Sequence, residues 1–155
     1  MNYKNEIELE KYVRKLIKNN ITIKNKNIYA LTNKKVVDIV VCKDGKNPAL
    51  FFLEIKYYQK SHGRLSLGSG NGVGFQPEIL SKSPNYFESN LRWVIASEEF
   101  PNKMIFASSK TISKYVSGGK VSNKFNNIQA RIFKEVPLID ESIFIKELKK
   151  WIKNT

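Results

Sequence analysis

The stretch VVDIVVCKDGKNPALFFLEIKYY, residues 36–58, decides the fold of this 155-residue chain. Its two halves, residues 36–42 and 49–58, are apolar and rich in β-branched and aromatic residues, which is typical of buried strands. The run KDGKNP between them has the composition of a turn. The stretch therefore predicts a β-hairpin inside a sheet rather than at its edge.

Two carboxylates interrupt these apolar strands, Asp38 in the first and Glu54 in the second. A carboxylate near a core is costly unless it is paired, hydrogen-bonded or bound to a metal. Glu54 and Lys56 lie on one face of their strand because residues i and i+2 point the same way. Pairing within the hairpin can place Asp38 beside Glu54. The pattern therefore predicts that two carboxylates and one lysine converge.

Such a cluster has two physical interpretations. Two close carboxylates repel each other unless a cation lies between them, and oxygen ligands suit Mg²⁺, which activates water and polarises a phosphoryl oxygen. The lysine then stabilises developing charge or assists deprotonation. The alternative is an ordinary ion pair, of Glu54 with Lys56 or of Asp38 with a neighbouring lysine. The metal site is favoured because one turn joins the two apolar strands that carry the acids.

Outward from the hairpin, hydropathy and turn residues predict alternating helices and strands. We expect a helix at 5–19, a strand or short hairpin at 21–31, a glycine-rich loop at 61–74, a helix at 77–82 broken at 83–85, a further turn at 86–88, strands at 91–96 and 104–107, a helix at 109–116, a strand at 128–136 and a helix at 140–153. No repeat or linker divides the chain, which predicts one α/β domain over residues 1–155.

Charge indicates the class of partner. The chain has 27 basic and 14 acidic residues, a formal net charge of +13, and this surplus favours nucleic acid. Part of the lysine surplus fits the codon bias of an AT-rich genome, because Asn and Ile are also abundant. The bases are spread along the chain, which argues against a membrane anchor, and no apolar run approaches the roughly 20 residues of a membrane span. Cys42, the only cysteine, excludes an intrachain disulfide and favours a reducing, cytoplasmic location.

The motif Asp38, 15 residues, then Glu54-Ile55-Lys56 resembles the PD-(D/E)-x-K nuclease superfamily, which includes type II restriction endonucleases and Holliday junction resolvases. Val37 stands where the family name has proline. The resemblance implies a restriction-endonuclease-like domain, in which an N-terminal helix and further helices flank a central mixed β-sheet. It also implies that Asp38, Glu54 and the Ile55 backbone bind Mg²⁺, and that Lys56 acts on the nucleophilic water.

Many members of this superfamily add a glutamate from the first helix. Glu6 is the best candidate because it borders the apolar stripe, Glu10 is the second choice, and Glu8 points away. The alternative for Glu6 is an acid placed at a helix N-terminus because the macrodipole favours it there. Gln76 is similar in position to the Gln motif of exonuclease-type members, although Leu80 stands where those enzymes have tyrosine.

Candidate DNA contacts follow the predicted strand at 49–58, which carries Glu54-Ile55-Lys56. The glycine-rich run LGSGNGVG, residues 67–74, matches no phosphate-binding fingerprint, although its amides can meet a DNA phosphate. We expect residues 110–136 to reach the major groove, where Asn and Lys side chains serve bases and phosphates equally well. His62, the only histidine, is either a DNA contact or a plain loop residue. The predicted DNA-binding residues are Lys60, His62, Arg64, Gln76, Lys110, Lys114, Lys120, Asn123 and Lys124.

Together these features predict a Mg²⁺-dependent endonuclease that hydrolyses phosphodiester bonds in double-stranded DNA. The layout of residues 76–116 resembles that of the smallest type II restriction enzymes, and cutting both strands predicts a homodimer. A Holliday junction resolvase, or another structure-specific nuclease, would share the same site. A basic DNA-binding module without catalysis is the second alternative.

Overall fold

The structure is a computed structural model, and it describes residues 3–22, 28–31, 37–62, 65–66, 84–116 and 127–154. Within these ranges no helix is both long and apolar enough to cross a bilayer. The predicted helix at 77–82 and the glycine-rich run at 67–74 lie outside the described residues.

A mixed five-stranded sheet forms the centre of the molecule, with the strand order β1-β2-β3-β5-β6. The pairs β1–β2, β2–β3 and β5–β6 are antiparallel, whereas β3 and β5 run parallel. The prediction of a central mixed sheet is therefore confirmed. The strands are β1 (Ile28–Leu31), β2 (Ile39–Lys43), β3 (Ala49–Tyr58), β5 (Leu91–Ser97) and β6 (Met104–Ser108).

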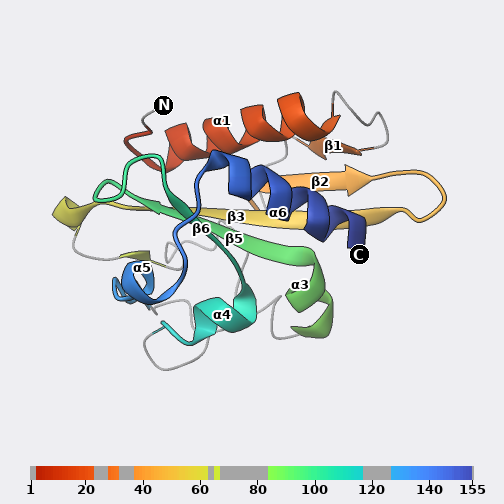
Figure 1. Cartoon of the computed structure of the whole chain (residues 1–155). Helices are drawn as coiled ribbons and strands as arrows, with labels where there is room; N and C mark the ends of the chain where they lie inside the picture. The colour runs from red at the N-terminus through yellow and green to blue at the C-terminus, as the bar shows by residue number, and fades with distance from the viewer. Residues whose placement is uncertain are drawn as a thin grey trace.

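Helices cover both faces of this sheet (Figure 1). One face packs against the two long amphipathic helices, α1 and α6, through a core that includes Leu53 and Ile55 of β3. The other face carries three short helices over a second core that includes Trp93 and Ile95 of β5. The helices are α1 (Glu6–Ile17), α3 (Pro84–Asn90), α4 (Ser109–Ser113), α5 (Ile132–Glu135) and α6 (Glu141–Asn154).

The predicted hairpin is the β2–β3 pair, in which Ile39 lies opposite Leu53 and Lys43 opposite Ala49. The strand expected at 36–42 is shifted, because β2 begins only at Ile39. Asp38 consequently lies in the bend just before the strand instead of interrupting it. Continuing the observed register by one position still sets Asp38 opposite Glu54, so the expected juxtaposition holds.

The prediction of a strand at 128–136 is wrong. Only Asn127 and Ile128 form a strand, β7, which pairs with the two-residue β4 (Leu65–Ser66). The chain then turns into α5, where Ile132 and Phe133 enter the second core. The alternation of apolar residues was misleading, because adjacent residues that are both buried fit a helical face and not an amphipathic strand.

Three other boundaries differ from the sequence-based expectations. The segment at 18–22, part of which was expected to begin a strand, forms a π-helical turn after α1. The further turn expected at 86–88 is part of a longer helix, α3, which begins at Pro84, in line with the preference for proline in a first helical turn. The helix expected at 109–116 ends at Ser113.

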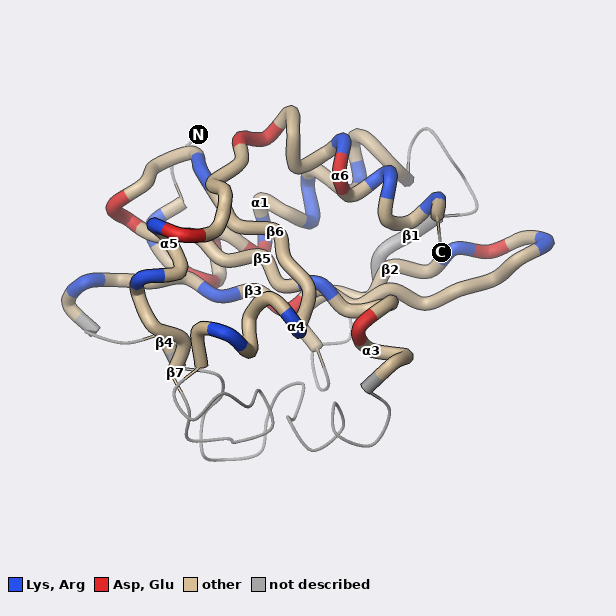
Figure 2. Tube along the Cα trace, turned by 60° about the horizontal axis from the view of Figure 1, so that its bottom comes forward, with Lys and Arg blue, Asp and Glu red and all other residues tan. Residues whose placement is uncertain are grey.

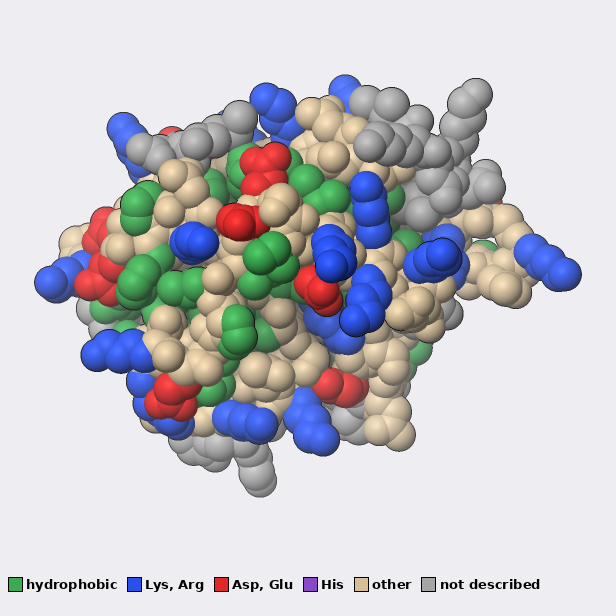
Figure 3. All heavy atoms as spheres, in the orientation of Figure 1, with side chains coloured by type: hydrophobic (Ala, Val, Ile, Leu, Met, Phe, Trp, Pro, Cys, Tyr) green, Lys and Arg blue, Asp and Glu red, His purple; other side chains and the backbone are tan. Residues whose placement is uncertain are grey.

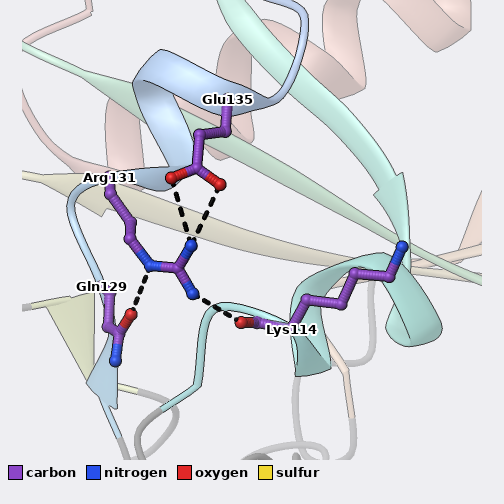
Figure 4. A network of polar contacts seen from close by, with 4 residues as sticks. All are labelled: Lys114, Gln129, Arg131 and Glu135. Atoms are coloured by element: carbon purple, nitrogen blue, oxygen red, sulfur yellow. Dashed lines mark hydrogen bonds and ion pairs between the residues drawn. The ribbon is translucent and has the colours of Figure 1, made fainter.

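The contact between α4 and α5 depends on Arg131 (Figure 4). Its guanidinium donates to Gln129 Oε1 at 2.6 Å, to both carboxylate oxygens of Glu135 at 3.0 and 3.1 Å, and to the Lys114 carbonyl at 2.9 Å. It also lies over the Tyr115 ring, 4.9 Å from the centroid. One side chain thus fixes the backbone that follows α4 to the start of α5.

Arg131→Met should lower the free energy of unfolding by about 1–2 kcal/mol, because it removes both the carbonyl hydrogen bond and the cation–π contact. Glu135→Gln should cost less than about 0.5 kcal/mol, since both partners of that ion pair are about half exposed and water screens it. Urea denaturation of the two variants checks this. Equal losses would mean that the contacts of Arg131 with the Lys114 carbonyl and the Tyr115 ring add nothing to the stability that its ion pair with Glu135 supplies.

Candidate active site

The site begins where β2 leaves β3. Their ladder ends at the pair Ile39–Leu53, so β3 continues beyond that point without β2 beside it. Alternate backbone groups of a strand point to the same side, so the N–H groups of Ile55 and Tyr57 face the side that β2 has left. Each of these N–H groups interacts with a carboxylate. Ile55 N donates to Asp38 Oδ2 at 2.6 Å, and the N–H of Tyr57 lies near enough to the Glu6 carboxylate to lower the pKa of that acid.

Glu54 and Lys56 project from β3 between these two acids. Lys56 Nζ lies 2.9 Å from Glu54 Oε1 and 3.9 Å from Glu6 Oε1. Both Glu54 and Lys56 are buried. The predicted residues Glu6, Asp38, Glu54 and Lys56 are therefore brought together, and we call these four the acid–lysine cluster.

The first helix supplies Glu6 because of how α1 starts. Asn5 is the N-cap, and its side chain accepts a hydrogen bond from Glu8 N, which sets the first turn. Leu9 and Val13 are fully buried, so the adjacent Glu6 is held at the sheet. Between the two candidates from the sequence, Glu6 contacts Lys56, whereas Glu10 pairs with Arg14 at 2.8 Å.

Arg14 is a residue that the sequence reasoning missed. While its Nε binds Glu10, its NH2 group donates to the backbone carbonyl of Asp38. Asp38 is thus held at its carbonyl by α1 and at its carboxylate by β3. The i,i+4 spacing of Glu10 and Arg14 was a usable signal for the ion pair, but nothing in the sequence pointed from that pair to Asp38.

Burial sets the ionisation of the cluster. Burial is the largest cause that raises the pKa of Glu54, to about 7, against the opposing effect of Lys56. Burial also raises the pKa values of Glu6 and Asp38. For Lys56 burial alone would lower the pKa, but the surrounding carboxylates outweigh it and raise the value, so the ammonium stays protonated. One ammonium therefore faces three carboxylates.

The donor set of the cluster fits a small divalent cation. Glu54 Oε2 is buried and has no hydrogen-bond partner, which is costly for a carboxylate oxygen. With all four residues of the acid–lysine cluster ionised, three negative charges against one positive charge leave the cluster a net charge of −2, and the nearby cation Arg14 is itself paired with Glu10. The carbonyl of Ile55 also points to the side that β2 has left, because its N–H does.

In the described ranges no set of three or more Asp, Glu, His or Cys side chains is arranged to hold a metal ion. Two carboxylates and a backbone carbonyl remain sufficient for Mg²⁺, because this ion keeps several of its waters when proteins bind it.

The predicted DNA-binding residues are only partly described. Lys60, Lys110 and Lys114 are exposed, and Lys60 lies two residues beyond the end of β3 and four residues after Lys56. His62 ends a short 3₁₀ turn (Lys60–His62), with only its backbone described. Basic residues lie on both sides of the sheet rather than along one edge (Figure 2). The predicted contacts Arg64, Gln76, Lys120, Asn123 and Lys124 lie outside the described residues.

Comparison with known proteins finds no matching family model, no matching curated protein and no matching solved structure. The resemblance to the PD-(D/E)-x-K superfamily therefore stays a prediction, carried by the motif and by the geometry around it.

The metal-free protein should become less stable as the pH rises from about 5 to about 8. The folded state keeps a proton on Glu54 up to about pH 7, whereas the unfolded chain releases it near the ordinary value of 4.5. The folded state then binds more protons in this window, so its free energy of unfolding falls as pH rises.

Glu54→Gln should remove this part of the pH dependence, because the amide does not titrate. Urea denaturation of both proteins in the presence of a chelator measures it, and the difference between them cancels the contribution of titrating groups far from the acid–lysine cluster. An identical pH slope in the two proteins would contradict the assigned ionisation of Glu54.

Proposed function

We propose that this protein is a Mg²⁺-dependent endonuclease that hydrolyses phosphodiester bonds in double-stranded DNA, of the type II restriction kind. The observation that carries the proposal is the buried, unpartnered Oε2 of Glu54, next to Asp38 and beside the protonated Lys56. A purely structural ion pair needs one carboxylate for one lysine. This lysine faces three carboxylates, an arrangement that is unfavourable without a further cation.

Asp38, Glu54 and the Ile55 carbonyl would hold the Mg²⁺. When bound, the ion supplies charge stabilisation at the phosphoryl group and lowers the pKa of its water. Asp38 suits this role because its backbone carbonyl and its carboxylate are each held by a hydrogen bond, which leaves the carboxylate little freedom.

Lys56 would act on the reacting atoms. Its three donors can bind the attacking water or stabilise charge on the phosphoryl oxygens. Glu6, 3.9 Å from the ammonium, would orient it. Because the neighbouring acids raise the pKa of Lys56, charge stabilisation is the better supported of these roles, and proton abstraction by Lys56 the less favoured.

Double-stranded DNA is the proposed substrate because of the net charge of +13. The exposed lysines at 60, 110 and 114 are proposed phosphate contacts. A homodimer is proposed because two-fold symmetry presents one site to each strand.

Asp38→Asn and Glu54→Gln should each abolish Mg²⁺-dependent cleavage while leaving DNA binding in Ca²⁺ within about twofold of wild type, because neither removes a basic residue. Cleavage of a mixed panel of plasmid, phage and four-way-junction DNA measures activity, and sequencing the fragment ends tells a restriction enzyme from a resolvase. Glu99→Gln, in the exposed turn between β5 and β6, is the matched control. Cleavage by either cluster variant within a few-fold of wild type would contradict the proposed roles.

Lys56→Met should reduce the cleavage rate by about 10²-fold or more, the scale for losing a positioned charge-stabilising group. The variant should keep its fold, because methionine fills the volume of the lysine stem. Single-turnover cleavage together with thermal unfolding separates the two effects. A large fall in melting temperature with an unchanged rate would assign Lys56 to a structural ion pair.

A further inference from the structure

A second polar site lies on the other face of the sheet. A groove between α6 and strands β5 and β6 is lined by Arg92, Ser108, Thr111, Lys150 and Asn154. In the β3–β5 register Arg92 lies opposite Leu53, and residues opposite each other project from the same face of a sheet. Leu53 belongs to the core under α1 and α6, so Arg92 projects from that face. Glu54 and Lys56 pair with Trp93 and Ile95 of the second core, so the groove and the acid–lysine cluster face opposite ways.

Arg92 is a half-buried cation on which the Glu88 carboxylate acts only through longer-range electrostatics. Its NH1 group donates to the carbonyls of Glu88 and Leu91 at 2.7 and 2.8 Å, and its guanidinium lies 5.0 Å from the Trp151 ring. Among the described residues it forms no ion pair, and its Nε and NH2 groups make no hydrogen bond. Burial lowers the pKa of Arg92 and outweighs the opposing effect of the Glu88 carboxylate. A desolvated charge of this kind is stabilised by an anion.

The other polar groups of the lining are mostly donors. Lys150 is exposed at the groove, and Asn154 offers an amide. The hydroxyl of Ser108 accepts from Thr111 N and can donate to a ligand when Thr111 Oγ1 is the donor in the 3.5 Å contact between the two hydroxyls. Glu147 is the only acid among the described residues of the lining, where two cations outnumber this one carboxylate. Figure 3 shows Lys and Arg side chains gathered over α6, with an acidic side chain among them.

We propose that this groove binds a phosphate group, held by Arg92 and Lys150. A guanidinium fork, an ammonium, a hydroxyl and an amide offer more donors than a planar carboxylate can use, and they match the several oxygens of a tetrahedral phosphate. The phosphate belongs either to a free anion or nucleotide, or to a nucleic-acid strand bound away from the acid–lysine cluster. The proposal does not depend on nuclease activity.

The test is a titration of the ¹⁵N-labelled full chain, followed by NMR at the Arg92 Nε–H and the Trp151 indole N–H. Separate arms use inorganic phosphate, adenosine monophosphate and a short DNA duplex, in a chelator so that no cleavage occurs. We expect saturable shifts of both signals. Saturation by phosphate or the mononucleotide identifies a free ligand, and saturation by the duplex alone identifies a nucleic-acid strand.

Matched variants test whether the phosphate binds in this groove. Lys150→Met should weaken binding about tenfold or more, the value of one charge-assisted hydrogen bond. Lys149→Met, the same charge change on an exposed neighbour outside the groove, should leave binding within about twofold. Arg92→Gln should abolish binding. If Arg92→Gln unfolds the protein, the comparison of the two lysine variants still tests the proposal. No saturable shift in any arm, or equal losses in the two lysine variants, would overturn the proposal.

Discussion

The hydrogen bond from the Ile55 N–H to the carboxylate of Asp38 is the interaction on which the site depends. A side chain here takes the place of the next backbone partner, so the β2–β3 ladder stops at Leu53 while β3 runs on to Tyr58 in contact with β5. Because β2 has separated from β3, one edge of β3 is left open, and Glu6 from α1 can reach Lys56 there. Arg14 keeps the bend at Asp38 in place by binding its carbonyl.

Electrostatic magnitudes decide how the cluster is best interpreted. An unsatisfied buried polar group costs about 1–3 kcal/mol, and more when it is charged. One lysine compensates one carboxylate, but Glu6, Asp38 and Glu54 all face it. Burial is the largest cause of the raised pKa values of all three acids, and repulsion from neighbouring carboxylates adds to it. A bound divalent cation would balance the remaining charge, and this is why we favour a metal site over a stabilising ion pair.

The sequence allowed the hairpin, the shared face of Glu54 and Lys56, and the choice of Glu6 to be predicted, because strand and helix periods fix which side chains share a face. The position of Asp38 before β2 could not be predicted, since strand ends depend on competing hydrogen bonds. The prediction of a strand at 128–136 was wrong, because the alternation of apolar and polar residues there concealed the adjacent buried pair Ile132 and Phe133 of a helix. The link from Arg14 to Asp38 is a contact between residues far apart in sequence, and local patterns carry no signal for it.

The central claim is that the acid–lysine cluster binds a divalent cation at the edge of β3. Paramagnetic broadening by substoichiometric Mn²⁺ tests it most directly, because it locates the ion without requiring activity or a known DNA sequence. The amide signals of residues 38 and 54–57 should broaden first, and Mg²⁺ should reverse the effect. Broadening that begins instead at exposed acids such as Glu98, Glu99 or Glu141, with the signals of 54–57 unchanged, would contradict the account.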